Sequence, residues 1–470
     1  MATIRVSSET EFTKALLTAN GGDTILLKAG TYSDLDIKDN RQNDLDFSST
    51  VTIRSKDPNN RAVINELFVQ GASNIKISDV VLDYTGRQAS DTESWLRGSP
   101  FAFKGTTDIT LSGVEVKGHL VNGYGKDTGL YVNTSKGFTL ENSTITDFNL
   151  ALNAWRDEDV RIEGNSFRGM NHDGLFFGEI DGVTIEDNFL GDYHSDAPAA
   201  LHKDNIQFYT GNGFGPSKDI VIRGNTLDSS DYRHGVFIFN EMNRDGNNSE
   251  SARHKNILIE DNYIHTTNTH GITVTFADGV TVRNNTVILN DEGGFDQVPL
   301  INVSLTSKNV DIVGNTVASV QGEVDGTWNV EGNIVEGFSR FHWGGVFKNG
   351  VLVDVNIPAP DKQVISDGDG DSFEFVGGHI DPARPVIIAG LDLDQGDELT
   401  LTGFDKGTFV GSAAINDGAG FSLDSVKELK EIVYWSHDVI GRASLDHNDL
   451  LLYIDQGQEG VATFVLTDYF

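Results

Sequence analysis

The sequence predicts an all-β fold in which short parallel strands wind into a solenoid. One phrase recurs along the chain: a strand of alternating aliphatic residues, a polar turn that contains Asn, and a further aliphatic residue. Its clearest copies are VRIEGNSF, VTIEDNFL, IVIRGNTL, ILIEDNYI, VTVRNNTV, VDIVGNTV and WNVEGNIV. Their Asn residues are 23, 37, 37, 23, 30 and 18 positions apart. A period of about 20 to 23 residues with insertions is typical of the coils of a β-solenoid.

The N-terminal segment predicts the first coil and its cap. Residues 6–32 read as a strand, an amphipathic helix over residues 9–19, a Gly–Gly turn and a second strand. Because the open end of a solenoid exposes an unpaired sheet edge, a helix placed there would cover it.

The central segment predicts the stack of coils. Degenerate copies of the phrase precede the clear ones: IKISDVVL, ITLSGVEV and FTLENSTI. The turn Asn residues of the clear copies are Asn165, Asn188, Asn225, Asn262, Asn285, Asn315 and Asn333. We interpret them as structural, because amides stacked at one turn can hydrogen-bond from coil to coil.

The composition changes after Pro358-Ala359-Pro360. Residues 361–470 carry 21 acidic and 6 basic side chains, and Gly–Asp turns separate their β-rich runs. We therefore expect a solenoid domain over residues 1–357 and a smaller acidic β domain over residues 361–470, for secretion or stability. No cofactor is expected to be required. Calcium is a possible bound ion, because Asp367, Asp369 and Asp371 occupy alternating positions, as acidic ligands do in half of a calcium-binding loop.

The composition of the whole chain excludes several classes of protein. The 470 residues contain no Cys, which excludes a disulfide scaffold, a thiolate zinc site and a cysteine nucleophile. A net charge of -35 argues against nucleic-acid partners and against docking on anionic membranes. The N-terminus lacks the apolar segment of a secretory signal, and no apolar run is long enough to span a membrane.

A second alignment predicts where the chemistry lies. The strands DGLFFG, DNIQFY, HGVFIF and HGITVTF begin at Asp173, Asp204, His234 and His270. Because coils stack about 4.8 Å apart, these first residues should form a column about 15 Å long. Further titratable groups lie next to it in the sequence: His172, His202, Lys203 and Arg233.

The longest insertions flank this column. They include GDYHSDAPAAL, TGNGFGPSK and EMNRDGNNSESARHK, and long loops beside a polar strand face can form the wall of a groove. Local positive charge from Lys203 and Arg233 on an acidic protein favours a polyanionic polymer, such as a uronate-containing polysaccharide.

The residue types suit β-elimination from a uronate. That reaction removes the proton α to the carboxylate and expels the C4 oxygen, so it needs a base, an acid and positive charge. We expect Lys203 to be the base and Arg233 the acid or charge stabiliser. The orienting or alternative acid/base groups would be His234, His202, Asp204 and Tyr232. The expected substrate-binding residues are His172, Asp173, Asn205, Gln207, Asn240 and His270.

These motifs resemble a known family. Lys203 and the later Arg233-His234-Gly235 look like the alginate lyase and chondroitinase B family, polysaccharide lyase family 6, whose enzymes use a Lys base and then an Arg followed by His-Gly. The opening GDTILLKAGTY is similar to that of right-handed parallel β-helix polysaccharide lyases, and the resemblance covers roughly residues 3–350. It implies a right-handed parallel β-helix and an alginate-like substrate. The chain departs from the family at DAPAALH, which lacks the acidic calcium ligands.

Three alternatives stay open. Asp173 and Asp204 on adjacent coils could serve a glycoside hydrolase, since paired carboxylates perform that chemistry. Arg233-His234-Gly235-Val236 resembles a phrase of secreted mannuronan C5-epimerases, although their Asp-Pro-His phrase is missing. A non-catalytic glycan-binding β-helix would need aromatic platforms instead of a titratable cluster.

The C-terminal segment indicates export. It resembles the C-terminal domains of bacterial proteins that leave the cell by type I secretion without a signal peptide. The terminal VATFVLTDYF fits that group, whereas its glycine-rich calcium repeat is missing. We therefore expect a secreted bacterial protein.

Overall fold

The structure is a computed structural model of the whole chain. It describes residues 1–39, 44–86, 99–194, 202–211, 213–290, 298–304, 306–318, 320–321 and 328–333, and the backbone of the strands that follow residue 344. The chain divides into two compact units, Met1–Phe295 with Thr306–Val310 and Asp296–Leu305 with Asp311–Phe470. The expected domain boundary between residues 357 and 361 stays a prediction.

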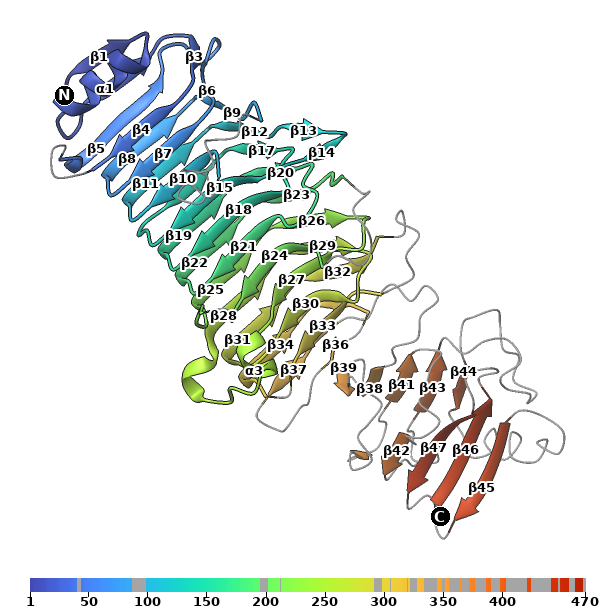
Figure 1. Cartoon of the computed structure of the whole chain (residues 1–470). Coiled ribbons are helices and arrows are strands. Elements are labelled where there is room, and N and C mark those ends of the chain that lie inside the picture. Colours follow the sequence, from blue (N-terminus) through green and yellow to red (C-terminus); the bar gives the residue numbers. More distant parts are fainter. Residues whose placement is uncertain are drawn as a thin grey trace. The chain divides into compact units, whose positions relative to one another are not determined.

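The first unit is built from three parallel sheets, and the chain passes through them in turn as it winds (Figure 1). Sheet A contains β1 (Thr3–Val6), β2 (Thr24–Leu27), β5 (Asp46–Ser55), β8 (Ser73–Ser78), β11 (Thr107–Ser112), β16 (Thr139–Glu141), β19 (Glu158–Glu163), β22 (Asp181–Glu186), β25 (Lys218–Arg223), β28 (His254–Glu260) and β31 (Ala277–Arg283). Sheet B contains β3 (Gly30–Tyr32), β6 (Ala62–Ile64), β9 (Val81–Asp83), β12 (Glu115–Lys117), β17 (Thr144–Thr146), β20 (Ser166–Arg168), β23 (Phe189–Gly191), β26 (Thr226–Ser229), β29 (Tyr263–Thr266) and β32 (Thr286–Leu289). Sheet C contains β4 (Leu35–Lys38), β7 (Leu67–Gln70), β10 (Phe101–Lys104), β15 (Thr128–Asn133), β18 (Leu150–Trp155), β21 (Leu175–Gly178), β24 (Asp204–Tyr209), β27 (His234–Ile238) and β30 (His270–Val274). The predicted parallel β-helix is confirmed.

Short elements project from the coils. The antiparallel hairpin of β13 (Leu120–Val121) and β14 (Tyr124–Gly125) follows β12. The helix α3 (Glu241–Arg244) and the 3-10 turn η1 (Glu250–Ala252) lie in the long insertion after β27. No helix in the described part of the chain is long and apolar enough to cross a membrane.

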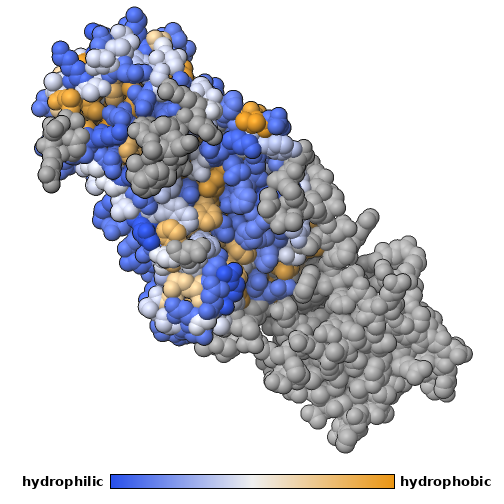
Figure 2. Space-filling model, viewed as in Figure 1, coloured by the Kyte–Doolittle hydropathy of each residue, from blue (hydrophilic) through white to orange (hydrophobic). Residues whose placement is uncertain are grey.

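The core fills the inside of the coils. On sheet C, alternate side chains such as Leu175 and Phe177 on β21, and Ile206 and Phe208 on β24, are fully buried. The residues between them point outward, because successive side chains of a strand alternate between the two faces. On the side of the first unit that Figure 2 shows, the coloured surface is mostly hydrophilic, with apolar patches among the polar side chains.

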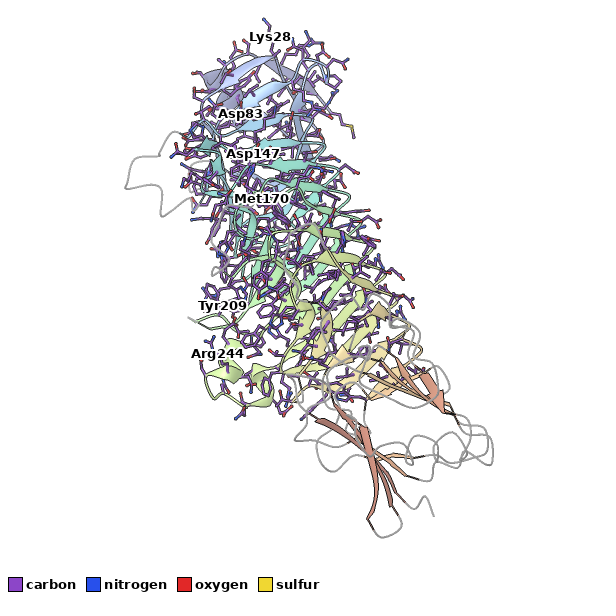
Figure 3. All side chains as sticks on the ribbon, turned by 90° about the vertical axis from the view of Figure 1, so that its right-hand side faces the viewer. Lys28, Asp83, Asp147, Met170, Tyr209 and Arg244 are labelled. Atoms are coloured by element: carbon purple, nitrogen blue, oxygen red, sulfur yellow. The ribbon has the colours of Figure 1, made fainter. Side chains whose placement is uncertain are left out.

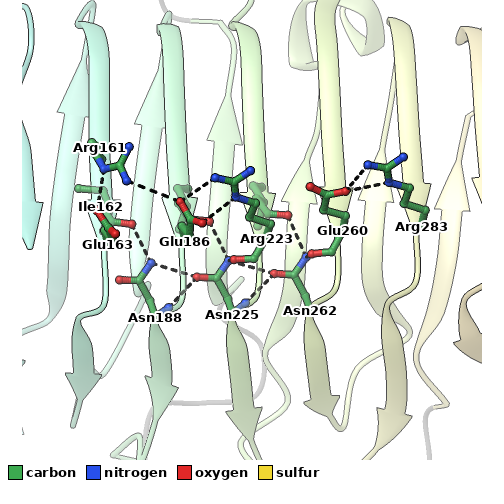
Figure 4. A network of polar contacts seen from close by, with 12 residues as sticks. Arg161, Ile162, Glu163, Glu186, Asn188, Arg223, Asn225, Glu260, Asn262 and Arg283 are labelled. Carbon is green, nitrogen blue, oxygen red and sulfur yellow. Dashed lines mark hydrogen bonds and ion pairs between the residues drawn. The ribbon is translucent and has the colours of Figure 1, made fainter. Parts of the chain in front are cut away.

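The turn between sheets A and B carries an asparagine ladder (Figure 4). Asn188 donates from its backbone N–H and from Nδ2 to Oδ1 of Asn225, both at 3.0 Å. The same pattern joins Asn165 to Asn188, Asn225 to Asn262, and Asn262 to Asn285. The structural interpretation of these residues is confirmed, and each coil is tied to the next by buried bonds.

The helix α1 (Glu9–Thr18) matches the predicted cap. The Ser8 hydroxyl accepts a hydrogen bond from the Glu11 N–H, as an N-cap does. Its buried face, which includes Phe12 and Leu16, packs beside β1 and β2.

The second unit begins with short strands of the same kind and continues with two five-stranded sheets. The short strands are β33 (Leu300–Val303), β35 (Thr316–Val317), β36 (Val320–Gln321), β37 (Asn329–Glu331) and the end of β34 (Lys308–Val313), whose first residues belong to the first unit. One sheet contains β39 (Val351–Asp354), β38 (Gly345–Lys348), β41 (Ser372–Val376), β43 (Glu398–Thr402) and β44 (Phe421–Leu423). The other contains β40 (Gln363–Ile365), β42 (Val386–Ala389), β47 (Val461–Thr467), β46 (Asp449–Asp455) and β45 (Gly441–Asp446). The calcium candidates Asp367, Asp369 and Asp371 lie outside the described residues.

Candidate functional site

The register of sheet C produces the predicted column. Asp204 at the start of β24 pairs with His234 at the start of β27. Leu175 pairs with Ile206, and Val236 pairs with Ile272. Two residues before these pairs, the same register places Asp173 beside Asp204 and His270 beside His234. Four titratable side chains from four coils therefore follow one another along sheet C.

Three imidazoles gather at one end of this column. The ring centroids of His202 and His234 are 4.4 Å apart, and those of His234 and His270 are 4.7 Å apart. Phe237 contacts all three rings at centroid distances between 4.6 and 5.3 Å. We call His202, Asp204, His234 and His270 the imidazole cluster.

Asp204 lies at the centre of the cluster. Its Oδ1 is 2.8 Å from Nδ1 of His234, and its Oδ2 is 2.9 Å from Nδ1 of His202. The carboxylate is fully buried, whereas the His202 side chain is 47% exposed and that of His234 is 10% exposed. His270 differs from the other two, since its Nδ1 lies 2.9 Å from the Thr273 hydroxyl.

The preceding coil repeats this arrangement. Asp173 accepts a hydrogen bond at Oδ1 from the Asp204 N–H at 2.9 Å, and its Oδ2 is 2.8 Å from Nδ1 of His172. Asp173 is buried and His172 is partly exposed. The expected site residues His172, Asp173, His202, Asp204, His234 and His270 thus lie together.

The protonation equilibria of the cluster are shifted in both directions. Burial raises the pKa of Asp173. Burial alone would also raise the pKa of Asp204, but the contacts with His202 and His234 outweigh it and hold that pKa below its usual value. Burial opposes charge on His202, yet Asp204 raises the pKa of this imidazole. Burial lowers the pKa of His270 to about 4, and the neighbouring charge of His234 adds to that shift.

Lys203 and Arg233 do not reach the surface. Their side chains are 1% and 0% exposed, and both bind Asp231. Nζ of Lys203 is 2.9 Å from Oδ2 of Asp231, and Arg233 donates to the same oxygen from Nη2 at 2.8 Å and to Oδ1 from Nε at 3.2 Å. Burial alone would raise the pKa of Asp231, but the two cations keep it lowered.

This ion triad also supports the start of β27. The Arg233 guanidinium stacks on the Tyr193 ring at 3.6 Å, and the Tyr193 hydroxyl donates to Oδ1 of Asn205 at 2.6 Å. Asn205 in turn donates from Nδ2 to the His234 carbonyl at 2.7 Å. Buried Lys203 and Arg233 therefore help to fix the position of His234. This arrangement differs from the direct contact with substrate that we expected for the two side chains.

Other expected site residues have structural partners. Asn205 is fully buried in the network just described. Asn240 is also buried: it caps α3 by accepting a hydrogen bond from the Asn243 N–H, and it donates to the Ala252 carbonyl at 2.7 Å. Tyr232 has a positive φ of 61°, a sparsely populated conformation for an aromatic residue, and its N–H donates to the Thr267 hydroxyl. Gln207 points outward between two aromatic residues of its column, Phe176 and Phe237.

Sequence reasoning missed Asp231. It stands two positions before Arg233 in SSDYRHG, and the signal was present, because a buried Lys or Arg needs an acidic partner. Sequence reasoning also missed an aromatic surface on sheet C.

The aromatic surface consists of Trp155, Phe176, Tyr209 and Phe214. The Trp155 ring stacks on Phe214 at 4.0 Å and lies 5.0 Å from Phe176 and 6.4 Å from Tyr209. Trp155, Gly178 and Tyr209 follow one another in register, and Gly178 is needed because a Cβ there would lie 2.2 Å from the indole ring.

Two guanidinium groups lie near these rings. Arg156 lies over the Phe214 ring at 4.7 Å. Arg244 on α3 and Tyr209 point to the same side of the first unit (Figure 3). Phe176, Gln207 and Phe237 follow one another in register on the outward face of sheet C. Because Phe237 contacts the imidazoles, the aromatic surface and the imidazole cluster share this face of the sheet.

The family comparison agrees with the fold. The family described as right handed beta helix region matches residues 67–317, more than half of the chain. The chain belongs to this right-handed β-helix family. No curated protein is similar enough to match.

Solved structures with related coils have low overall similarity. An alginate lyase from Paenibacillus sp. str. FPU-7 is 14% identical, with 71% of this chain and 99% of that chain covered and a TM-score of 0.32. The A-module of the mannuronan C-5 epimerase AlgE6 of Azotobacter vinelandii is 14% identical, with 71% and 97% covered and a TM-score of 0.32. PfbA, a surface adhesin of Streptococcus pneumoniae, is 13% identical, with 74% and 95% covered and a TM-score of 0.39. These likenesses concern the fold alone.

Proposed function

We propose that the protein is a secreted polysaccharide lyase that cleaves a uronate-containing, alginate-like polymer by β-elimination at the imidazole cluster. The observation that carries the proposal is a row of three imidazoles in ring contact, two of which are held by one buried carboxylate. Histidine is the side chain whose ordinary pKa lies closest to neutral, so such a cluster is suited to moving protons.

His270 is the proposed base. Its Nδ1 lies beside a hydroxyl, whereas His202 and His234 are both held at Asp204. In the reaction His270 takes the C5 proton, the C4–O4 bond breaks as the C4–C5 double bond forms, and the proton passes from His270 to O4. The imidazoles of His202 and His234, which Asp204 holds in place, stabilise the uronate carboxylate by hydrogen bonds from their ring N–H groups while the C5 proton leaves.

Lys203 and Arg233 receive a positioning role in this proposal. Their burial and their contacts with Asp231 support this role over the base and acid functions that the sequence alone favoured. Through Tyr193 and Asn205 they hold the backbone of His234 in place.

The aromatic surface supports a sugar polymer as substrate. Rings such as Trp155 and Tyr209 offer apolar faces with a polar edge, which suits the faces of sugar rings. Arg156 and Arg244 lie on this side of the first unit, paired with Glu179 and Asp245 at 2.9 Å, and their guanidinium groups can donate hydrogen bonds to sugar hydroxyls or carboxylates.

The test is turnover of a panel of polyuronates by wild type and two matched variants. His270→Gln should lower kcat by about 10²- to 10⁴-fold, the usual contribution of a general base. His265→Gln is the control, because His265 also lies beside a carboxylate, 2.9 Å from Asp228, but outside the cluster. Full activity of His270→Gln on every cleaved polymer would exclude His270 as the base.

A further inference from the structure

We propose that His202, Asp204 and His234 bind one divalent transition-metal ion. Each offers one ligand atom, and these atoms all lie within 4.8 Å of one another. Two imidazole nitrogens with one carboxylate form a ligand set typical of zinc and of related first-row metals. Three protein ligands leave a coordination position open for water or substrate, as in catalytic metal sites.

The distances in the site are close to those that a metal requires. Nδ1 of His234 and Nδ1 of His202 lie 2.8 and 2.9 Å from the two carboxylate oxygens. Ligands bound at about 2.0–2.2 Å from a tetrahedral zinc ion are roughly 3.3 Å apart. Each imidazole would therefore move away from its carboxylate oxygen by about half an ångström, and the ligand atoms, which lie within 4.8 Å of one another, would draw together around the ion. The half-exposed His202 side chain can make that movement.

A second observation points to a missing ligand. Oδ2 of Asp204 is inaccessible to solvent, and its ion-pair partner, Nδ1 of His202 at 2.9 Å, is poorly aligned for a hydrogen bond. A buried carboxylate oxygen without an aligned donor is costly, because buried polar groups almost always have a well-placed partner. A cation placed between Asp204 and the two imidazoles would satisfy this oxygen.

The two buried cations near the site do not compensate the charge of Asp204. Lys203 and Arg233 both bind Asp231. The ion-pair partners of Asp204 are the imidazoles of His202 and His234. A metal ion bound by these imidazoles and by Asp204 would compensate the buried carboxylate directly.

Hydrogen bonds to neighbouring residues fix the backbone of two of the proposed ligands, Asp204 and His234. The Asp204 N–H donates to Oδ1 of Asp173 at 2.9 Å, which fixes the backbone of the central ligand. The His234 carbonyl accepts from Nδ2 of Asn205 at 2.7 Å. Such outer contacts orient metal ligands and raise affinity.

The consequence for catalysis rests on the proposed function. A bound metal ion would supply the positive charge that stabilises the uronate carboxylate, while His270 next to His234 keeps its role as base. The binding site itself does not depend on that reaction.

The test is Zn²⁺ binding to the tag-free full-length chain after removal of metals with a chelator. Calorimetric titration and competition with a coloured chelator should show one equivalent that His202→Ala loses or binds at least about tenfold more weakly. Co²⁺ at the same site should give visible absorption bands that His202→Ala removes. His265→Ala is the matched control and should keep both signals, because His265 also pairs with an Asp.

Two results would overturn the proposal. One is the absence of stoichiometric Zn²⁺ binding by the wild-type chain. The other is equal binding by wild type and His202→Ala, with circular dichroism showing that both are folded. Zn²⁺ binding without turnover of any polyuronate would leave the metal site standing and refute the proposed function alone.

Discussion

Replacement of Asp231 by Ala should unfold the site region. Asp231 makes three charged contacts, at 2.8, 2.9 and 3.2 Å, with Lys203 and Arg233. Removal of one partner of a buried ion pair costs about 3–5 kcal/mol, because the remaining charge is left buried. Here one substitution leaves two buried cations without their acidic partner. We therefore expect the free energy of unfolding to fall by an amount near the upper end of that range, about 5 kcal/mol.

The matched control is Asp228→Ala. Asp228 also binds a basic side chain, His265 at 2.9 Å, but its carboxylate is 46% exposed. Exposed pairs contribute about 1 kcal/mol or less, so this variant should be close to wild type.

The measurement is urea unfolding at neutral pH, combined with hydrogen exchange at the amides of β24 and β27. Hydrogen exchange is needed because repeat proteins can unfold in segments, and it reports the site region directly. Equal stability of Asp231→Ala and Asp228→Ala, with unchanged exchange in both strands, would refute the buried ion triad.

Three further predictions concern the ladder, a buried acid and the aromatic surface. Asn188→Ala removes four hydrogen bonds with Asn165, Asn225 and Ile162 and should cost about 4 kcal/mol in urea unfolding; a loss below about 1 kcal/mol would contradict the ladder's role. Burial raises the pKa of Asp157 to about 7, so the folded state binds the proton more tightly and stability should fall as pH rises from about 4 to 7. The wild-type protein should lose up to about 4 kcal/mol of stability by pH 7, and Asp157→Asn should not show this loss. Parallel pH–stability curves of the two proteins would exclude the raised pKa of Asp157 as the cause. Trp155→Ala should raise KM for a polyuronate several-fold with a smaller change in kcat, and an unchanged KM would remove the aromatic surface from the binding site.

The fold could be predicted because its determinants are local and repeated. Each coil carries its own alternating strand and its own turn Asn, so Asn188 and Asn225 could be aligned without any knowledge of tertiary contacts. The column could be predicted for the same reason. Once the strands are in register, Asp204 and His234 must be neighbours.

The chemistry of single residues could not be predicted as well. Whether Lys203 faces solvent depends on its contact with Asp231, and whether Arg233 does depends on Asp231 and on the ring of Tyr193; these partners are remote from Lys203 in the sequence or lie in the turn before the strand. The aromatic surface was missed because Trp155 and Tyr209 are far apart in the sequence, and only their shared register across Gly178 brings the rings together.

The central claim is β-elimination from a polyuronate, and product analysis tests it most directly. Digests of a polyuronate panel would be measured for new reducing ends and for the ultraviolet absorbance of a C4–C5 double bond conjugated with the carboxylate. We predict one unsaturated uronate for each new reducing end on at least one polymer. New reducing ends without that absorbance would show hydrolysis and contradict the claim.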